Sequence, residues 1–123
     1  MIVGRFEPDN LIAGSDYPLV ATAVIVHGPD TEGETEFKRG DVIAFTSESK
    51  PVLVDSEGQD GEGRAVGIMC DDVTVKTGEQ ITTNMYIKGE FNQRALRFGG
   101  ADIVDKHRQH MNEIGLVIRE TRR

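Results

Sequence analysis

The sequence has 123 residues, of which 37% are hydrophobic and 28% are charged, and its formal net charge is −7. A chain of this length predicts a single domain, and its acidic charge opposes general nucleic-acid binding, because neutralising phosphates requires a basic face. The single cysteine, Cys70, excludes an internal disulfide and is typical of a reducing compartment. No apolar run approaches the roughly 20 residues of a membrane span, and no signal peptide is apparent. We therefore expect a small, soluble, intracellular domain.

The first 18 residues predict an extended N-terminal arm (1–18) in front of a single β-rich domain (19–123). They mix single apolar residues with Gly, Pro, Asp and Asn, and they show neither helical nor strand periodicity. The arm nevertheless carries more apolar side chains than a solvated tail needs, namely Ile2, Val3, Phe6, Leu11, Ile12 and Tyr17. Two interpretations stay open: these side chains fold back onto the core of their own chain, or they dock on a partner.

The domain begins with strand patterns. Residues 19–27 are rich in β-branched side chains and lie between a proline and a glycine, which predicts a strand. Residues 28–36 are acidic and turn-forming, and they predict a surface loop. The short apolar runs 42–45 and 52–54 are separated by a polar turn, which is typical of a hairpin.

More strands follow, and helical spacing is confined to the C-terminal third. Short apolar or alternating runs predict strands over 65–70, 73–76, 81–91 and 116–120. Residues 92–98 predict a short helix capped by Asn92, and residues 101–115 predict a longer helix capped by Asp102. The expected fold is mainly β, a small barrel or sandwich with one or two short helices near the C-terminus.

Charge is distributed unevenly along the chain. Residues 1–91 carry 7 basic and 17 acidic side chains, a net charge of −10, whereas residues 92–123 carry 7 basic and 4 acidic side chains, a net charge of +3. Such a bipolar domain could pack head-to-tail with copies of itself or sit on a charged partner. Ordinary solvated faces would explain the same pattern, and both interpretations stay open.

The residues that could perform chemistry do not form a recognisable site. His107 and His110 are spaced for one face of a helix, but no third ligand stands at a motif spacing. Cys70 lies within an apolar run and predicts a core residue. Asp71 and Asp72 are neighbours on an extended segment, so their side chains should point to opposite faces. We expect no catalytic residue, no metal and no cofactor, and the sequence argues against an enzyme.

One tripeptide motif is weak evidence for receptor binding. Arg39, Gly40 and Asp41 spell the sequence that some cell-adhesion receptors recognise. Here it stands at the start of a predicted strand in a chain without a secretion signal. A chance occurrence explains it better than receptor binding does.

Several short motifs in one order resemble the head decoration proteins of tailed phages, the lambda-like decoration protein D family. The likeness lies mainly in A-V-G-I-x-x-x-D-V and Y-x-x-G-E-F-N-x-x-A-L, and it covers roughly residues 11–118. The matching segments are LIAGSDYPLV (11–20), RGDVIAF (39–45), AVGIMCDDVTV (65–75), YIKGEFNQRAL (86–96) and GLVI (115–118). No single motif is diagnostic alone, and the loop 28–36 and the basic tail 119–123 match nothing in the family pattern.

The resemblance implies a β-clip type of fold and a structural role on the virion. Family members bind as homotrimers to the outside of the expanded capsid, at its three-fold and quasi-three-fold positions. There they hold neighbouring major capsid (coat) protein subunits against the pressure of packaged DNA, without catalysis or a cofactor. Their N-terminal arm orders on the capsid by adding to a strand of the coat protein. In this sequence the candidate coat-binding residues are Ile2, Val3, Phe6, Pro8, Leu11, Ile12 and Tyr17.

An alternative from another class is a small β-rich carrier or ligand-binding module, or an enzyme whose site is built across subunits. A carrier would present a modified lysine in a tight hairpin, and the nearest candidates are Lys50 and Lys88. A cross-subunit enzyme would have to bring together acidic and imidazole side chains from different copies. The residues it would use are His27, His107, His110, Asp71 and Asp72.

Overall fold

The computed structural model describes residues 11–14, 18–56, 63–100 and 102–120. These residues form nine strands, one α-helix and two 3₁₀ turns. The strands are β1 (Ile12–Gly14), β2 (Val20–His27), β3 (Glu34–Phe37), β4 (Val42–Phe45), β5 (Pro51–Leu53), β6 (Gly67–Met69), β7 (Val73–Lys76), β8 (Gln80–Asn92) and β9 (Leu116–Arg119). The helical elements are η1 (Gln93–Ala95), η2 (Val104–Lys106) and α1 (Arg108–Glu113). The fold is therefore mainly β with short helices near the C-terminus, as the sequence predicts.

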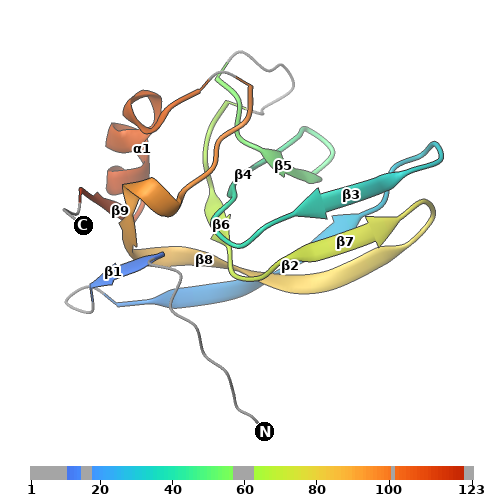
Figure 1. Cartoon of the computed structure of the whole chain (residues 1–123), viewed down its shortest axis with the longest axis horizontal. Helices are drawn as coiled ribbons and strands as arrows, with labels where there is room; N and C mark the ends of the chain where they lie inside the picture. The colour runs from blue at the N-terminus through green and yellow to red at the C-terminus, as the bar shows by residue number, and fades with distance from the viewer. Residues whose placement is uncertain (1–10, 15–17, 57–62, 101, 121–123) are drawn as a thin grey trace, which may run out of the picture.

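Strand β8, at 13 residues, organises the larger sheet. Along one side it pairs antiparallel with β1 and then with β2, and along the other side it pairs with β6 and, in parallel, with β9. Beyond β6 the sheet continues through β4 to β5, so it is open and does not close into a barrel. Figure 1 shows β8 and β2 running as a long ribbon away from the helical elements.

A glycine lets the long strand serve these different neighbours. Gly89 has a φ of +151°, in the region that favours glycine. A Cβ at this position would lie 2.7 Å from Leu19 Cδ1 and 2.9 Å from the Phe91 ring. The backbone can therefore change its path between the part that pairs with β2 and the part that pairs with β1 and β9.

A second, two-stranded sheet of β3 and β7 covers one face of the larger sheet. Between the two sheets lies a core cluster that includes Val26, Ile43, Met69 and Val75, each 0% exposed. Alternation in β7 accounts for this packing, because every second residue of the strand is buried. The arrangement is sandwich-like. It corrects the prediction of a loop over 28–36, since that acidic segment contains the start of β3 and pairs with β7.

A second core cluster lies at the helical end of the molecule, by which we mean η1, η2, α1 and β9. It includes Leu11, Phe91, Met111 and Leu116, with exposed fractions of at most 1%. Helix α1 contributes only Met111 to it, because its six residues make less than two turns.

Among the described residues, the helical segments are too short and too polar to span a lipid bilayer.

The predicted helix over 101–115 is shorter and interrupted. Only η2 and α1 are helical, and His107 separates them with φ −119° and ψ −6°. Asp102 does not cap a helix, because its carboxylate accepts hydrogen bonds from a distant loop. The predicted cap of the preceding turn is confirmed, since the Asn92 side chain accepts a hydrogen bond from Arg94 N at 3.1 Å.

Candidate functional site

The predicted partner-binding arm divides into two parts. Leu11 is 1% exposed and lies in the core, and its carbonyl accepts a hydrogen bond from Asn92 N at 2.9 Å. Ile12 begins β1, opposite Phe91, and is 36% exposed. The assignment of Leu11 to the coat-binding set is therefore wrong, because packing inside its own domain removes it from any partner. The other candidates, Ile2, Val3, Phe6, Pro8 and Tyr17, lie outside the described residues.

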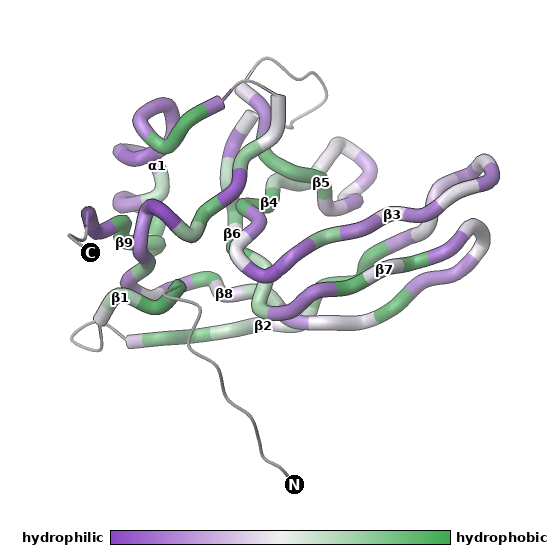
Figure 2. Tube along the Cα trace, viewed as in Figure 1, coloured by the Kyte–Doolittle hydropathy of each residue, from purple (hydrophilic) through white to green (hydrophobic). Residues whose placement is uncertain are grey.

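Next to β1, strand β2 is exposed in an unusual way. In its first half, Val20, Ala21, Thr22 and Ala23 are all exposed, although successive side chains of a strand point to opposite faces. Burial begins only at Val24. Figure 2 draws β2 mainly in green and white, whereas the tip formed by β3 and β7 is largely purple. The start of β2 is thus apolar, uncharged and open on both faces among the described residues.

Sequence reasoning missed this surface although a signal for it exists. Residues 17–29 form the longest stretch of the sequence without Asp, Glu, Lys or Arg. An uncharged run of this kind is also what a buried strand shows, so pattern alone cannot tell the two apart. The exposed large side chains are Leu19 (48%), Val20 (38%) and Ile25 (44%).

A polar cluster joins two distant loops at the helical end. The carboxylate of Asp102 accepts a hydrogen bond from Ser56 N and another from Ser56 Oγ, each at 2.6 Å, and His107 Nε2 lies 2.6 Å from it. The Phe98 ring stacks on His107 with centroids 5.3 Å apart. Burial would raise the pKa of Asp102, but the hydrogen bonds from Ser56 and His107 outweigh it and lower the pKa to about 2.

The geometry of this cluster is that of a structural contact between two loops. In a nucleophilic triad, the imidazole stands between the hydroxyl and the carboxylate, so that it can accept the hydroxyl proton. Here the carboxylate of Asp102 stands between Ser56 and His107 instead. The serine hydroxyl donates its proton to a strong acceptor and is not activated as a nucleophile. The cluster fastens residue 56 to the segment before α1.

The Arg39-Gly40-Asp41 tripeptide is likewise built into the fold. Asp41 is 0% exposed, and its carboxylate accepts hydrogen bonds from Lys38 N at 2.8 Å and Arg97 Nε at 2.6 Å. Arg39 donates to the Cys70 carbonyl at 2.8 Å. A receptor that reads this tripeptide needs the carboxylate in solvent, so the buried position of Asp41 agrees with a chance occurrence.

His107 and His110 have hydrogen-bond partners within the fold, and Cys70 is buried. His110 Nε2 lies 3.0 Å from the Ala65 carbonyl, and His107 belongs to the Asp102 cluster, so the two rings do not share a site. Cys70 is 8% exposed, and burial together with Asp71 raises its thiol pKa to about 11. Within the described ranges, no three His, Cys, Asp or Glu side chains converge where they could hold a metal ion.

The residues of the alternative functions are also separated. Asp72 Oδ1 accepts a hydrogen bond from Arg39 N at 2.9 Å, away from the His107 cluster. Lys50 lies in the turn between β4 and β5, where its carbonyl accepts from Thr46 N, but its ammonium stands 3.7 Å from Glu48. Within one chain, these residues do not assemble a site.

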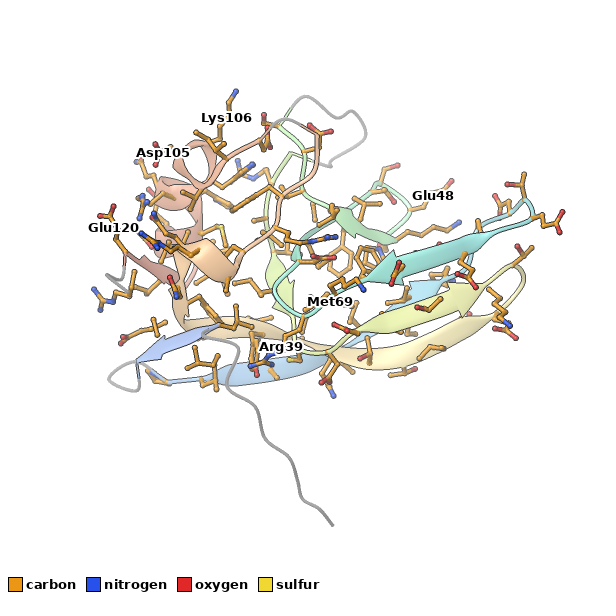
Figure 3. All side chains as sticks on the ribbon, viewed as in Figure 1. Arg39, Glu48, Met69, Asp105, Lys106 and Glu120 are labelled. Atoms are coloured by element: carbon orange, nitrogen blue, oxygen red, sulfur yellow. The ribbon has the colours of Figure 1, made fainter. Side chains whose placement is uncertain are left out.

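A groove of about 510 Å³ lies between β3 and β5. Phe37 and Leu53 form part of its apolar wall, and Glu36, Glu48 and Lys50 are among its polar residues. The groove is open and lined by both polar and apolar residues, and two of its carboxylates have lysine partners: Glu36 pairs with Lys38, and Glu48 pairs with Lys50. Figure 3 shows Glu48 on this side of the molecule and Asp105, Lys106 and Glu120 projecting outward at the helical end. His27 and Asp30 also line this groove, and no three His, Cys, Asp or Glu side chains of the described residues come together in a way that could hold a metal ion.

Comparison with protein-family models and with curated protein sequences finds no match. The polar side chains of the Asp102 cluster and of the Arg39-Gly40-Asp41 tripeptide make structural bonds, whereas the first half of β2 is exposed and uncharged.

Proposed function

We propose that this chain is a capsid decoration protein of a tailed phage. It binds as a homotrimer to the outer surface of the expanded head, at three-fold and quasi-three-fold positions. There it holds neighbouring coat-protein subunits together and stabilises the shell against the pressure of packaged DNA. Its place is on the virion, and it works by binding alone.

The observation that carries the proposal is where the arm joins the domain. Residues 1–10 lead directly into Leu11, which is anchored in the core, and into Ile12 at an outer strand of the sheet. A partner that holds the arm is thereby tied to the rigid part of the domain. Addition of Ile2, Val3 and Phe6 to an exposed strand of a coat protein would satisfy the backbone of the arm and bury its apolar side chains.

The motifs on which the resemblance rests support the same proposal, because their residues build the fold of the domain. In the GEFN stretch, Gly89 takes the positive φ, Glu90 is buried beside Arg119, Phe91 fills the core and Asn92 caps η1. Each residue of this stretch has a role in building the domain. A shared motif of this kind favours a shared scaffold, and the scaffold is what a cementing protein supplies.

Multivalency explains how so small a protein could hold a shell together. A single arm offers modest contact area and weak affinity. A trimer on a three-fold position presents three arms to a ring of equivalent sites, so the second and third contacts form at high effective concentration. The free protein is then expected to trimerise weakly, and the capsid completes the assembly.

Cosedimentation with expanded, empty capsids of the source phage tests the proposal. The full-length chain should bind saturably, in multiples of three per site, and a variant lacking residues 1–10 should not. The truncation stops before Leu11, because that side chain belongs to the core. The matched control is Ile103→Ser, which removes an exposed apolar side chain at the helical end and should bind normally. If the full-length chain binds neither expanded nor unexpanded shells, the proposal is wrong.

A further inference from the structure

The groove between β3 and β5 is bounded by a segment that the proposed function does not use. The acidic segment 28–36 matches nothing in the motifs of the decoration family, and it supplies Asp30 and Glu36 to one side of the groove. The hairpin of β4 and β5 supplies the other side, including Glu48 and Leu53. Figure 1 shows β5 on one side of β3 and β7 on the other. The groove therefore lies along the edge of β3 that is opposite β7.

The backbone of β3 presents hydrogen-bonding groups on the groove side. Thr77 N donates to the Gly33 carbonyl at 3.3 Å, so residues 33, 35 and 37 are the ones whose backbone groups are directed at β7. The N–H and C=O of Glu36, which lines the groove, then point away from β7. Among the described residues, β5 is also an end strand, since it pairs with β4 alone. An extended chain can add to a strand edge of this kind.

Carboxylates surround the groove. Asp30, Glu36 and Glu48 line it, and Glu79 lines a smaller pocket of about 310 Å³. The two adjoin, because both are lined by Asp30 and Lys50. Among the described residues that line them, Lys50 is the only lysine or arginine. The groove therefore offers an excess of negative charge, which is complementary to a basic ligand.

The present partners of two of these carboxylates can be exchanged. Glu36 Oε2 lies 3.1 Å from Lys38 Nζ, and Glu48 Oε1 lies 3.7 Å from Lys50 Nζ. All four side chains are between 44% and 74% exposed. Exposed ion pairs of this kind contribute little to stability. A cation on a bound chain can therefore replace either lysine without breaking the fold.

We propose that this groove binds a basic, extended segment of a partner protein. The segment adds to the edge of β3 at Glu36, and its lysine or arginine side chains meet the carboxylates of Asp30, Glu36 and Glu48. Because side chains alternate along a strand, the opposite face of the segment carries apolar side chains that rest on Val52 and Leu53. Acidic segments are rejected, since like charges repel across the contact.

This inference goes beyond the proposed function and does not rest on it. The arm enters the domain at Leu11 and continues into β1, which pairs with the end of β8 near Phe91. Figure 1 shows β1 well apart from β3 and β5. The arm and the groove can thus hold different segments at the same time, whether these belong to one partner or to two.

Three capped hexapeptides with a fluorescent label test the proposal by anisotropy, at about 0.15 M salt and up to about 1 mM protein. KVKVKV alternates basic and apolar side chains, EVEVEV reverses the charge, and KPKPKP keeps the charge but loses the N–H of every second residue. KVKVKV should bind saturably at one site per chain, and the other two should bind at least about tenfold more weakly. Absence of KVKVKV binding, or equal binding of KPKPKP, would overturn the proposal.

Amide chemical shifts locate the bound peptide in the wild-type protein. Addition of KVKVKV should shift residues 34–37 and 51–53 and leave β2 unchanged. Strand β2 is the informative comparison, because among the described residues it also pairs with β8 alone. Shifts confined to β2 would place the peptide on another strand edge, and the proposal would be wrong.

A pair of double variants separates the groove from the overall charge of the protein. Glu36→Lys with Glu48→Lys reverses two exposed carboxylates of the groove. Asp105→Lys with Glu120→Lys makes the same change of charge at the helical end, where Figure 3 shows both side chains projecting outward.

The groove variant should bind KVKVKV at least about tenfold more weakly than wild type and EVEVEV more tightly, whereas the control variant should bind both within about threefold of wild type. Circular dichroism should show both variants folded. Equal losses in the two variants would mean that the peptide responds only to net charge, which contradicts a site in the groove. Because no shell enters these measurements, their outcome is independent of whether the chain decorates a capsid.

Discussion

The helical end of this molecule and strand β2 differ in how far their polar and apolar groups are paired or buried. At the helical end, Asp102 is surrounded by partners, and it joins elements that are 46 residues apart in sequence. Along β2, by contrast, the strand exposes apolar side chains and an edge that pairs with no other described strand. The helical end therefore contributes contacts that stabilise the single chain, whereas the described residues leave the first half of β2 exposed. Substitutions at the two ends should therefore affect different measurements.

The largest expected effect is the loss of a partner from the Asp102 cluster. The side chains of Asp102 and His107 are only 3% and 4% exposed, so His107→Ala leaves a carboxylate buried with one donor fewer and removes the stack on Phe98. We expect the free energy of unfolding to fall by about 3 kcal/mol, measured by urea denaturation. Lys106→Ala, at an exposed neighbour, should change it by less than about 0.5 kcal/mol. Equal effects of the two variants would contradict the structural role of the cluster.

Adjacent residues of β2 provide the sharpest form of the comparison. Val24 is 5% exposed and packs in the core, whereas Ile25 is 44% exposed on the outer face. Val24→Ala should lower the free energy of unfolding of the monomer by about 2 kcal/mol, because buried methyl groups are lost and a cavity forms. Ile25→Ala should lower it by less than about 0.5 kcal/mol in dilute protein. Thermal unfolding at low concentration measures both, and a large loss at Ile25 in the monomer would mean that this face is packed.

The smallest expected effect is the contribution of Asp102 to acid stability. Its folded pKa of about 2 lies below the ordinary value of 3.8, so the charged form stabilises the folded state. This contribution is fully present above about pH 4 and is lost as the pH falls from 3.8 toward 2. The stability gap between wild type and Asp102→Asn should therefore shrink by about 1.5 kcal/mol over that range. A gap that stays constant from pH 5 to pH 2 would show that the carboxylate does not titrate as described.

The local sequence pattern is sufficient to predict most of the strands. Alternation and β-branched composition predict the strand over 19–27, the hairpin of β4 and β5, and the strands β6 to β9, and each is present. The signal is local because side-chain direction in a strand has a period of two residues, which a short window already displays. The prediction that Cys70 is a core residue is confirmed for the same reason, since it lies within an apolar run.

The errors share a cause in contacts between distant segments. The sequence pattern predicts Leu11 in a partner-binding arm, yet it lies in the core cluster with Phe91 and Met111. The acidic composition of 28–36 predicts a loop, yet the end of this segment pairs with β7, about 40 residues away. Asp102 is predicted to cap a helix because aspartate favours that position. Ser56, 46 residues away, offers it two hydrogen bonds instead.

By itself, the sequence determined a small acidic β-rich domain, its order of strands and the residues with inward-pointing periodicity, because these depend on neighbours within a few positions. Only the tertiary structure decided which strand would lie at an edge. An apolar run such as 19–27 reads the same whether another strand covers it or not, and coverage depends on how β8 distributes its two sides among β1, β2, β6 and β9. The exposed side of β2 among the described residues is a consequence of that distribution.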